Sequence, residues 1–139
     1  MFYYPVAIGQ DTETGQFMVE FIDVPAVYAV GERREEALLN AADALETAFF
    51  YLMQEHQPIP LASPLNNRLG VVLSVMMAGK VALYNAMLSL GIRKADLARK
   101  LNMAATLVDR LVSLKHNSRI EQIETALALL DKRLLVDVN

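Results

Sequence analysis

The alternation of apolar and polar positions predicts a β-hairpin near the start of the chain. Residues 3–8 (Tyr-Tyr-Pro-Val-Ala-Ile) and 17–22 (Phe-Met-Val-Glu-Phe-Ile) are rich in aromatic and β-branched side chains, which is typical of strands. Residues 9–15 between them carry two glycines and turn-forming polar side chains. Because Pro5 cannot donate a ladder hydrogen bond, we expect the first strand to have an edge or a bulge there. Residues 27–30 predict a short third strand.

Beyond the hairpin, apolar side chains recur every three or four residues from 35 to 55 and predict one amphipathic helix, which two prolines end. The next 24 residues after a loop, 69–92, contain a single charge, Lys80, and have the hydropathy of a membrane span. A lysine at the middle of a span costs about 2.5–3.5 kcal/mol on insertion scales. We therefore expect a buried strand over 71–76 followed by a helix over 79–90.

The C-terminal part of the pattern is helical, with short interruptions. Residues 94–101 predict one helix, and a turn at Asn102 leads to a second helix that begins at 104 or 105 and ends at 114. Ser118, with a glutamate three residues later, has the spacing of a capping box and predicts a last helix. Residues 134–138 (Leu-Leu-Val-Asp-Val) predict a strand that is too short to stand alone and needs a partner.

Composition excludes several kinds of chemistry. Of 139 residues, 54% are hydrophobic and 21% charged, so a buried core can form and wholesale disorder is excluded. The absence of Cys removes disulfides, thiolate metal sites, Cys nucleophiles and iron–sulfur clusters. His56 and His116 lie far apart in sequence, so we expect no zinc site, and we assign no metal and no cofactor. The first residues lack the pattern of a signal peptide, which predicts a soluble cytoplasmic protein.

A metal-dependent nuclease would require several carboxylates that converge on one site. The candidates in the N-terminal half are Asp11, Glu13, Asp23 and Asp43. The first two lie in the hairpin turn, where acidic side chains are ordinary turn formers. We therefore expect a solvated acidic surface, no catalytic residue and no enzymatic activity. We also expect two neighbouring pairs, Tyr3-Tyr4 and Met76-Met77, to belong to the core and not to a cofactor site.

Charge divides the chain into two parts of opposite balance. Through Ala78 there are three basic and ten acidic residues, a balance of −7, whereas from Gly79 onward there are ten basic and six acidic residues, a balance of +4. Between Lys80 and Arg119 the balance is +6, from eight basic and two acidic residues. This division suggests two functions, one of them at nucleic acid, and we expect domains at 1–78 and 79–139. The alternative is that both charged faces are simply solvated surface, and charge alone does not decide between the two.

The strongest motif lies in the basic part, over residues 93–114. Apolar or small residues have the spacing of a helix-turn-helix core at Leu97, Ala98, Leu101, Val108 and Leu111. Asn102 stands where the turn needs a left-handed backbone, which Asn tolerates better than most residues. Such a unit places its second helix in the major groove of DNA. Two helices joined by a tight turn also occur in plain helical bundles, and the surrounding positive charge favours DNA binding over that alternative.

This motif is similar to the helix-turn-helix of phage-repressor-like proteins. Position by position, the resemblance implies base contacts by Ala105, Thr106 and Arg110 and a phosphate contact by Lys94. Arg110, on the face opposite Leu107 and Leu111, has the paired donors that read a guanine edge. Residues after the second helix could hold the DNA backbone: Lys115, His116, Asn117 and Arg119. Ala104 and Ala105 depart from the polar readers that many relatives carry.

The order of short motifs along nearly the whole chain resembles the HicB-type antitoxins of bacterial toxin–antitoxin pairs. The matching segments are 4–7 (Tyr-Pro-Val-Ala), 17–25, 31–38, 80–87 (Lys-Val-Ala-Leu-Tyr-Asn-Ala-Met), 109–111, 122–127 and 132–134 (Lys-Arg-Leu). Two positions depart from the family pattern. Ile22 stands where a Pro often precedes Asp23, and Arg33 stands where a Thr often caps the helix, which predicts a poorly capped first helix.

The resemblance implies an α+β fold: a partial RNase H-like β-β-β-α-β domain over residues 1–78, then an all-α helix-turn-helix domain with a short C-terminal strand over 79–139. It implies an antitoxin that binds and neutralises a HicA-type mRNA-cleaving toxin. It also implies autorepression of the operon through operator DNA, and assembly as a homo-oligomer, a dimer or a dimer of dimers, with no membrane. The acidic N-terminal half fits a toxin that must present positive charge to RNA. The residues assign no toxin contacts. An alternative function is a stand-alone transcription regulator with a ligand-sensing N-terminal domain.

Overall fold

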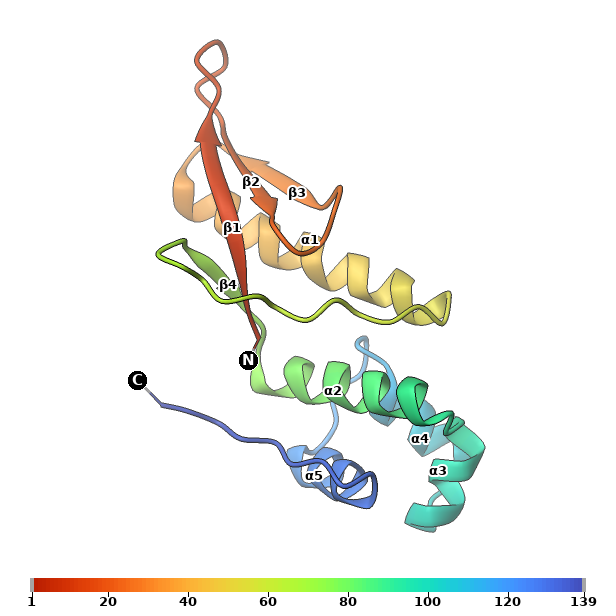
Figure 1. Cartoon of the computed structure of the whole chain (residues 1–139). Helices are drawn as coiled ribbons and strands as arrows, with labels where there is room; N and C mark the ends of the chain where they lie inside the picture. Colours follow the sequence, from red (N-terminus) through yellow and green to blue (C-terminus); the bar gives the residue numbers. More distant parts are fainter. Residues whose placement is uncertain (1, 139) are drawn as a thin grey trace. The chain divides into compact units, whose positions relative to one another are not determined.

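The computed structural model describes residues 2–138 and contains four strands and five helices (Figure 1). In chain order they are β1 (Tyr3–Gln10), β2 (Phe17–Phe21), β3 (Tyr28–Gly31), α1 (Arg34–Gln54), β4 (Gly70–Val72), α2 (Val75–Leu90), α3 (Lys94–Leu101), α4 (Ala105–Val112) and α5 (Ile120–Leu129). The predicted α+β class and the β-β-β-α-β order of the first half are confirmed. The chain forms two compact units, which we call the N-terminal unit (up to Glu55, with Ile59–Leu73) and the C-terminal unit (His56–Pro58, with all residues from Ser74).

The N-terminal unit is an antiparallel sheet with α1 packed against one face. The strand order is β3-β2-β1-β4, and Val6 pairs with Phe21 in the β1–β2 hairpin, which confirms the predicted hairpin. Side chains that alternate toward α1 form the core together with the buried stripe of the helix. At its centre, the ring of Tyr4 meets Phe49 of α1 edge-on, with 5.4 Å between ring centroids.

The start of α1 depends on a close approach to β3. A Cβ at Gly31 would lie 2.5 Å from the backbone nitrogen of Ala37, so only glycine fits there. The N-cap residue Arg33 makes no side-chain capping hydrogen bond, as its departure from the family pattern predicts. Glu35 and Glu36 in the first turn place negative charge at the positive end of the helix dipole.

Pro5 corrects one expectation about the first strand. β1 is an internal strand, paired with β2 on one side and β4 on the other, so Pro5 does not lie on a sheet edge. The carbonyl of Pro5 accepts a hydrogen bond from Ile22 at 3.1 Å, directly beyond the last register pair with β2. The backbone N–H that Pro5 lacks is therefore missing only where the pairing between β1 and β2 ends.

The boundary between strand and helix near residue 74 is also corrected. β4 ends at Val72, and α2 begins at Val75, so the expected strand over 71–76 is shorter and the helix starts four residues sooner. The reason is Ser74, whose hydroxyl accepts from the Met77 amide at 3.2 Å and caps the helix. Within residues 2–138, no single helix has the length and apolar character to cross a bilayer. The neighbouring helices α2 and α3 have that length and composition only when taken together, and the chain bends by 109° between them.

In the C-terminal unit, α4 and α5 pack against α2, and α3 packs against α4 and α5. α2 is buried along most of its length, from Ala78 to Met87, as expected for a helix that is apolar on nearly all sides. Gly79 allows α5 to approach, since a Cβ there would lie 2.9 Å from the Cγ2 of Ile123. The predicted division at 78/79 falls inside α2, whereas the last passage of the chain from one unit to the other is at Leu73/Ser74.

Four further expectations differ from the structure. Arg119, not Ser118, is the N-cap of α5, because the Ser118 hydroxyl bonds elsewhere. Residues 134–138 form no strand in the single chain, where no sheet edge of the C-terminal unit is available to them. Of the two adjacent tyrosines, only Tyr4 is buried, because neighbouring strand residues point to opposite faces. Met76 and Met77 are half-buried in the first turn of α2.

Candidate functional site

The pair α3–α4 carries the residues singled out for DNA contact. α3 ends at Asn102, whose backbone is left-handed at φ 53° and ψ 46°, as the sequence predicts. The two helices bury Leu97, Ala98, Val108 and Leu111, and leave Leu101 half-buried. The tight connection brings the first residue of α3 close to α4: Lys94 Nζ lies 2.9 Å from the Oδ1 of Asp109.

All seven predicted DNA-contact residues are exposed: Lys94, Ala105, Thr106, Arg110, Lys115, Asn117 and Arg119. Thr106 and Arg110 are four residues apart on α4 and therefore share one helix face. Leu107, expected on the buried side, is 45% exposed, because the buried stripe of this short helix is Val108, Leu111 and Val112. Asp109 pairs with Lys94, and among residues 2–138 the Arg110 guanidinium forms no ion pair.

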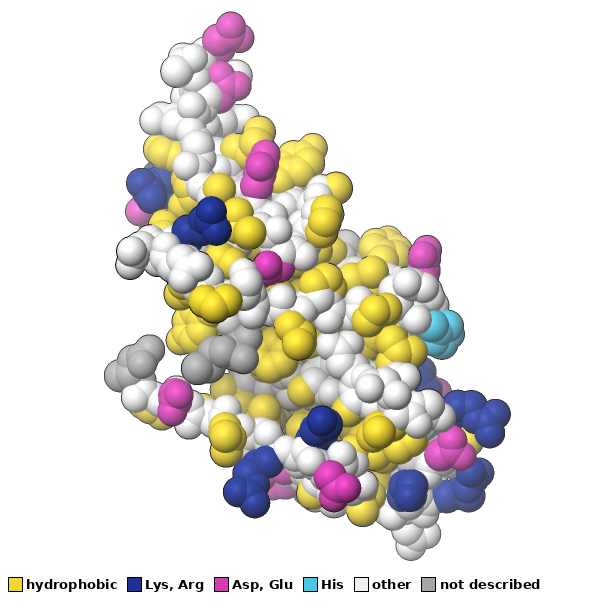
Figure 2. Space-filling view, viewed as in Figure 1, with side chains coloured by type: hydrophobic (Ala, Val, Ile, Leu, Met, Phe, Trp, Pro, Cys, Tyr) yellow, Lys and Arg dark blue, Asp and Glu magenta, His cyan; other side chains and the backbone are white. Residues whose placement is uncertain are grey.

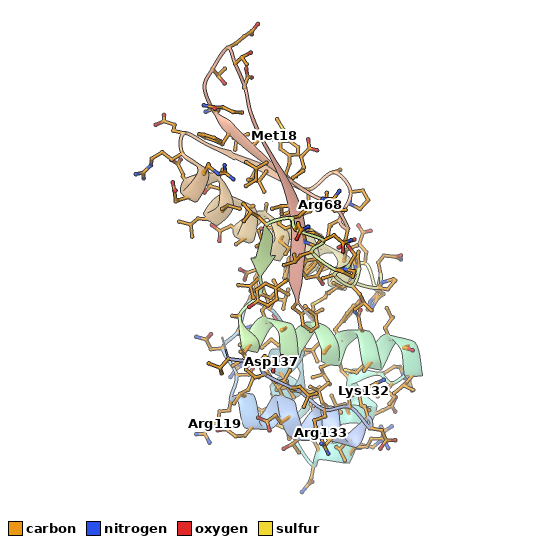
Figure 3. All side chains as sticks on the ribbon, turned by 60° about the vertical axis from the view of Figure 1, so that its left-hand side comes forward. Met18, Arg68, Arg119, Lys132, Arg133 and Asp137 are labelled. Atoms are coloured by element: carbon orange, nitrogen blue, oxygen red, sulfur yellow. The ribbon has the colours of Figure 1, made fainter. Side chains whose placement is uncertain are left out.

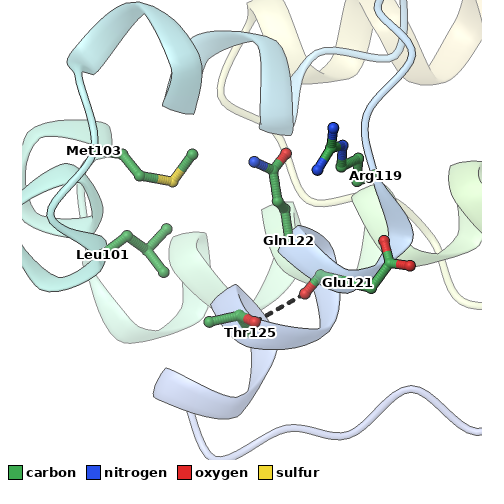
Figure 4. Close-up of a pocket in the computed structure, with 6 residues that line it drawn as sticks. All are labelled: Leu101, Met103, Arg119, Glu121, Gln122 and Thr125. Atoms are coloured by element: carbon green, nitrogen blue, oxygen red, sulfur yellow. Dashed lines mark hydrogen bonds between the residues drawn. The ribbon is translucent and has the colours of Figure 1, made fainter.

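Arg119 also lies on the wall of an open cavity of about 540 Å³ between the α3–α4 connection and α5 (Figure 4). The lining residues are Leu101, Met103, Arg119, Glu121, Gln122 and Thr125. The hydroxyl of Thr125 donates to the Glu121 carbonyl at 2.8 Å, within the helix (Figure 4). The side chains of Arg119 and Gln122 extend into the same space, so Arg119 contributes both to this cavity and to the basic surface.

The residue that sequence reasoning missed is Lys80. It is only 1% exposed, and its ammonium donates to three carbonyl oxygens, of Arg110 at 2.8 Å, Ser113 at 2.7 Å and His116 at 2.8 Å. A fourth oxygen, the Ser118 hydroxyl, lies 2.9 Å away. Burial lowers the pKa of Lys80 to about 8. The signal that could have found it is its position as the single charge among residues 69–92.

The N-terminal unit presents an apolar sheet face on the side that α1 does not cover. Its exposed side chains are Tyr3, Met18, Tyr28, Val30 and Val72, between 37% and 60% exposed. The register places Tyr28 beside Glu20 and Val30 beside Met18, so these residues form one surface across β2 and β3. Figure 3 labels Met18 on this sheet, and Figure 2 shows apolar side chains gathered over β2 and β3 below an acidic hairpin tip.

The acidic residues considered for a nuclease site have separate structural roles. The carboxylate of Asp11 accepts hydrogen bonds from the Glu13 amide at 2.8 Å and the Thr14 amide at 3.4 Å, as in a hairpin turn. Asp23 accepts from the Ser63 amide at 2.8 Å and the Ser63 hydroxyl at 3.0 Å, which holds the loop before β4. In the described range, 2–138, no three His, Asp or Glu side chains gather where they could hold a metal ion.

Comparison with known proteins gives the family. Residues 3–82 match a family model described as the HicB-like antitoxin of a bacterial toxin–antitoxin system. "Antitoxin HicB" of Escherichia coli (strain K12) is 39% identical over 134 residues, which cover 94% of this chain and 95% of that protein. The chain belongs to the HicB antitoxin family. Family membership makes it an antitoxin of a toxin–antitoxin system and implies a toxin as its partner.

Other HicB proteins match over similar lengths. "Antitoxin HicB" of Pseudomonas fluorescens (strain Pf0-1) is 36% identical over 141 residues and covers 100% of this chain and 95% of that protein. "Antitoxin HicB 2" of Photorhabdus laumondii is 40% identical over 131 residues, with coverage of 94% and 92%. The crystal structure of the Burkholderia pseudomallei antitoxin HicB matches at 19% identity with a TM-score of 0.44, over 53% of this chain and 63% of that one. The HicB family model ends in α2, whereas the matches to whole HicB proteins extend through the C-terminal unit.

Proposed function

We propose that the chain neutralises a HicA-type, mRNA-cleaving toxin through its N-terminal unit and represses its own operon through α3 and α4. In this proposal the N-terminal unit is a partial RNase H-like domain and the α3–α4 pair is a helix-turn-helix. The observation that supports it best is the division of charge between the units. The N-terminal unit holds three basic and ten acidic residues, and the C-terminal unit holds ten basic and six acidic residues.

The open sheet face is the part of the N-terminal unit best suited to bind the toxin. A toxin that cleaves RNA must present a positively charged surface to its substrate. The sheet face offers exposed apolar area at Met18 and Tyr28 for close packing. Glu20 lies beside Tyr28 on this face and adds a carboxylate, and the strands carry no basic residue. An apolar centre with an acidic surround is complementary to such a surface.

The test is a charge substitution on this face, with a matched substitution on the opposite side of the same unit. Tyr28→Arg places a like charge against the toxin, whereas Leu39→Arg changes the outer side of α1, where Leu39 is 71% exposed. The full-length variants are co-expressed with the small basic protein of the neighbouring reading frame, and the purified complex is quantified. We expect Tyr28→Arg to lose the complex and Leu39→Arg to retain it. Equal retention by both variants would place toxin binding elsewhere.

DNA binding is proposed for the basic surface of α3, α4 and the loop that follows α4. Lys94, Arg110, Lys115 and Arg119 are exposed there, and Figure 2 shows Lys and Arg side chains gathered over the C-terminal unit. Thr106 and Arg110 share the exposed face that would enter the major groove, and Lys94 and Lys115 lie at positions suited to DNA phosphates. Binding of a duplex from upstream of the chain's own reading frame tests this part of the proposal, and the absence of binding would favour antitoxin activity alone.

Assembly into a homo-oligomer is proposed through residues 134–138. Leu135, Val136 and Val138 are 81%, 56% and 92% exposed in the single chain. Apolar residues in an extended segment gain both hydrogen bonds and burial when they pair with the same segment of a second copy. A dimer formed in this way would present two α4 helices to DNA, as a palindromic operator requires.

A further inference from the structure

Lys80 is the buried charge that neither toxin capture nor direct DNA contact explains. It lies in α2, and in the part of the chain that the structure describes it is the one buried charged residue, at 1% exposure. Burial of an ammonium is strongly unfavourable unless every proton finds an acceptor. A methionine or leucine would fill the same space without that cost. The reason for an ammonium at this position is therefore sought in the groups that it hydrogen-bonds.

The acceptors of Lys80 belong to one continuous segment. Arg110 lies in the last turn of α4, Ser113 is its C-cap, and His116 and Ser118 lie in the loop that follows. The Nζ atom lies 2.7–2.9 Å from an oxygen of each of these four residues. An ammonium has three protons, so all of them are used within this segment.

The end of α4 explains why a cation is suited to this position. The last carbonyl groups of a helix lack partners within the helix, and they form its negative end. α4 ends after two turns at Val112, and the backbone of Ser113 is already extended at φ −75° and ψ 132°. Ser118 closes the same segment, because its hydroxyl also donates to the Arg110 carbonyl at 3.4 Å. The backbone from 110 to 118 therefore turns around the Lys80 ammonium.

This arrangement directs side chains as well as backbone. The carbonyls of residues 110, 113 and 116 are held inward, whereas the side chains of Arg110, Lys115, His116 and Asn117 are exposed. We propose that Lys80 is a positioning residue for the DNA-contacting surface: it fixes the backbone of the segment 110–118 and so sets where Arg110 and Lys115 meet DNA. The second half of this statement rests on the proposed DNA binding, and the first half does not.

The test compares full-length wild type with Lys80→Met, which keeps the side-chain volume but removes the ammonium. Amide hydrogen exchange of residues 113–118 reports the order of the loop, and DNA affinity over a salt series reports the placement of its cations. We expect the substitution to speed amide exchange at 113–118 at least about tenfold relative to wild type, a larger increase than at the α5 amides of the same variant. We expect DNA affinity to fall about tenfold, and the salt slope to decrease by about 0.9 for each phosphate that the variant no longer neutralises.

Two further variants separate positioning from loss of stability. Lys132→Met removes an exposed charge outside the segment, and we expect it to leave exchange at 113–118 unchanged. Ser118→Ala removes one of the four acceptors while keeping the ammonium, and we expect a smaller increase in exchange at the same amides. If Lys80→Met fails to fold, Ser118→Ala decides: unchanged exchange at 113–118 in that variant would overturn the proposal.

The outcomes also distinguish this inference from the proposed function. A Lys80→Met protein that melts at a lower temperature, but keeps wild-type loop exchange, DNA affinity and salt slope below its melting range, would show a merely structural role. If wild type itself binds no DNA, the proposed repression fails, and faster exchange at 113–118 still supports Lys80 as the group that fixes this loop. Toxin capture by Lys80→Met is expected to match wild type, because the N-terminal unit is unchanged.

Discussion

In each unit of the chain a deeply buried polar side chain binds a loop, Tyr4 in the N-terminal unit and Lys80 in the C-terminal unit, and the two differ in charge. In the N-terminal unit, the neutral hydroxyl of Tyr4 donates one hydrogen bond to the Pro60 carbonyl at 2.8 Å. In the C-terminal unit, the Lys80 ammonium reaches three carbonyls and a hydroxyl. A phenol can tie one point of a loop at low desolvation cost, whereas an ammonium can gather several carbonyls only by giving up its own hydration.

The surfaces of the two units differ in a way that parallels their proposed partners. The N-terminal unit exposes an apolar sheet face in an acidic setting, which suits close packing against a folded protein. The C-terminal unit exposes separate cations on short helices and a loop, which suits phosphates and base edges. The loop that Lys80 holds belongs to the second kind of surface, and under the proposed DNA binding its cations have to match the spacing of DNA groups.

The largest expected effect concerns the assembly into a homo-oligomer that we propose for residues 134–138 of the C-terminal unit. Truncation after Asp131 should convert an oligomer into monomers, because it removes the exposed apolar segment 134–138. Light scattering after size exclusion measures the mass, and DNA affinity should fall with it. Leu135→Lys serves as a milder variant that leaves Leu134 in place, and an unchanged mass in both variants would refute a role for this segment.

The next effect compares the two buried polar groups directly. Lys80→Met should lower the free energy of unfolding by about 2–4 kcal/mol, because several buried carbonyls lose their donor. Tyr4→Phe removes one donor from one carbonyl and should lower it by about 1 kcal/mol. Urea denaturation of the full chain measures both. Equal losses of unfolding free energy in the two variants would mean that the additional acceptors of Lys80 contribute nothing to stability, which would contradict this prediction.

A smaller effect separates base reading from phosphate binding within the C-terminal unit. If Arg110 reads a guanine, Arg110→Ala should weaken operator binding by about 1–3 kcal/mol and relax the preference at one base pair per half-site. Lys94→Ala should weaken all sequences alike and reduce the salt slope by about one. A binding series over operator variants distinguishes them. Uniform weakening by Arg110→Ala would mean that Arg110 binds the DNA backbone instead.

Local patterns predicted much of the fold, and long-range interactions account for most of what they missed. The hairpin, α1, and the α3–α4 pair with left-handed Asn102 follow from periodicity and turn chemistry within a few residues. The role of Ser118 could not be predicted from its capping-box spacing, because its hydroxyl bonds Lys80, 38 residues away in sequence. The start of α2 was missed because one polar residue, Ser74, marks it inside an apolar run.

The candidate site was predictable only in part, for the same reason. The exposure of Thr106 and Arg110 follows from helical spacing, whereas the ion pair between Lys94 and Asp109 depends on how α3 and α4 cross. The open sheet face was missed because alternation in β2 and β3 leaves apolar residues on both sides. Met18 and Tyr28 could be placed on the uncovered side only once α1 was known to cover the other.

The last effect is a pH dependence with opposite signs in the two units. Burial, with a further contribution from the Asp23 charge, raises the pKa of Tyr4 from 10.0 to about 12. Between pH 10 and 12 the folded unit therefore holds a proton that the unfolded chain has released, so stability from this group is lost as the pH rises. The pKa of Lys80 is lowered by burial from 10.5 to about 8. Between pH 8 and 10.5 the unfolded chain holds the additional proton, so this group makes the C-terminal unit more stable as the pH rises.

Differences between wild type and single variants isolate these two windows from all other titrations. The stability difference between wild type and Tyr4→Phe should shrink from pH 10 to 12. The difference between wild type and Lys80→Met should grow from pH 8 to 10.5. Urea midpoints measured at intervals of half a pH unit resolve both slopes. A difference that stays constant over that window and decreases only above pH 10.5 would mean that the hydrogen bonds to the ammonium outweigh its desolvation, so that the pKa of Lys80 is not lowered.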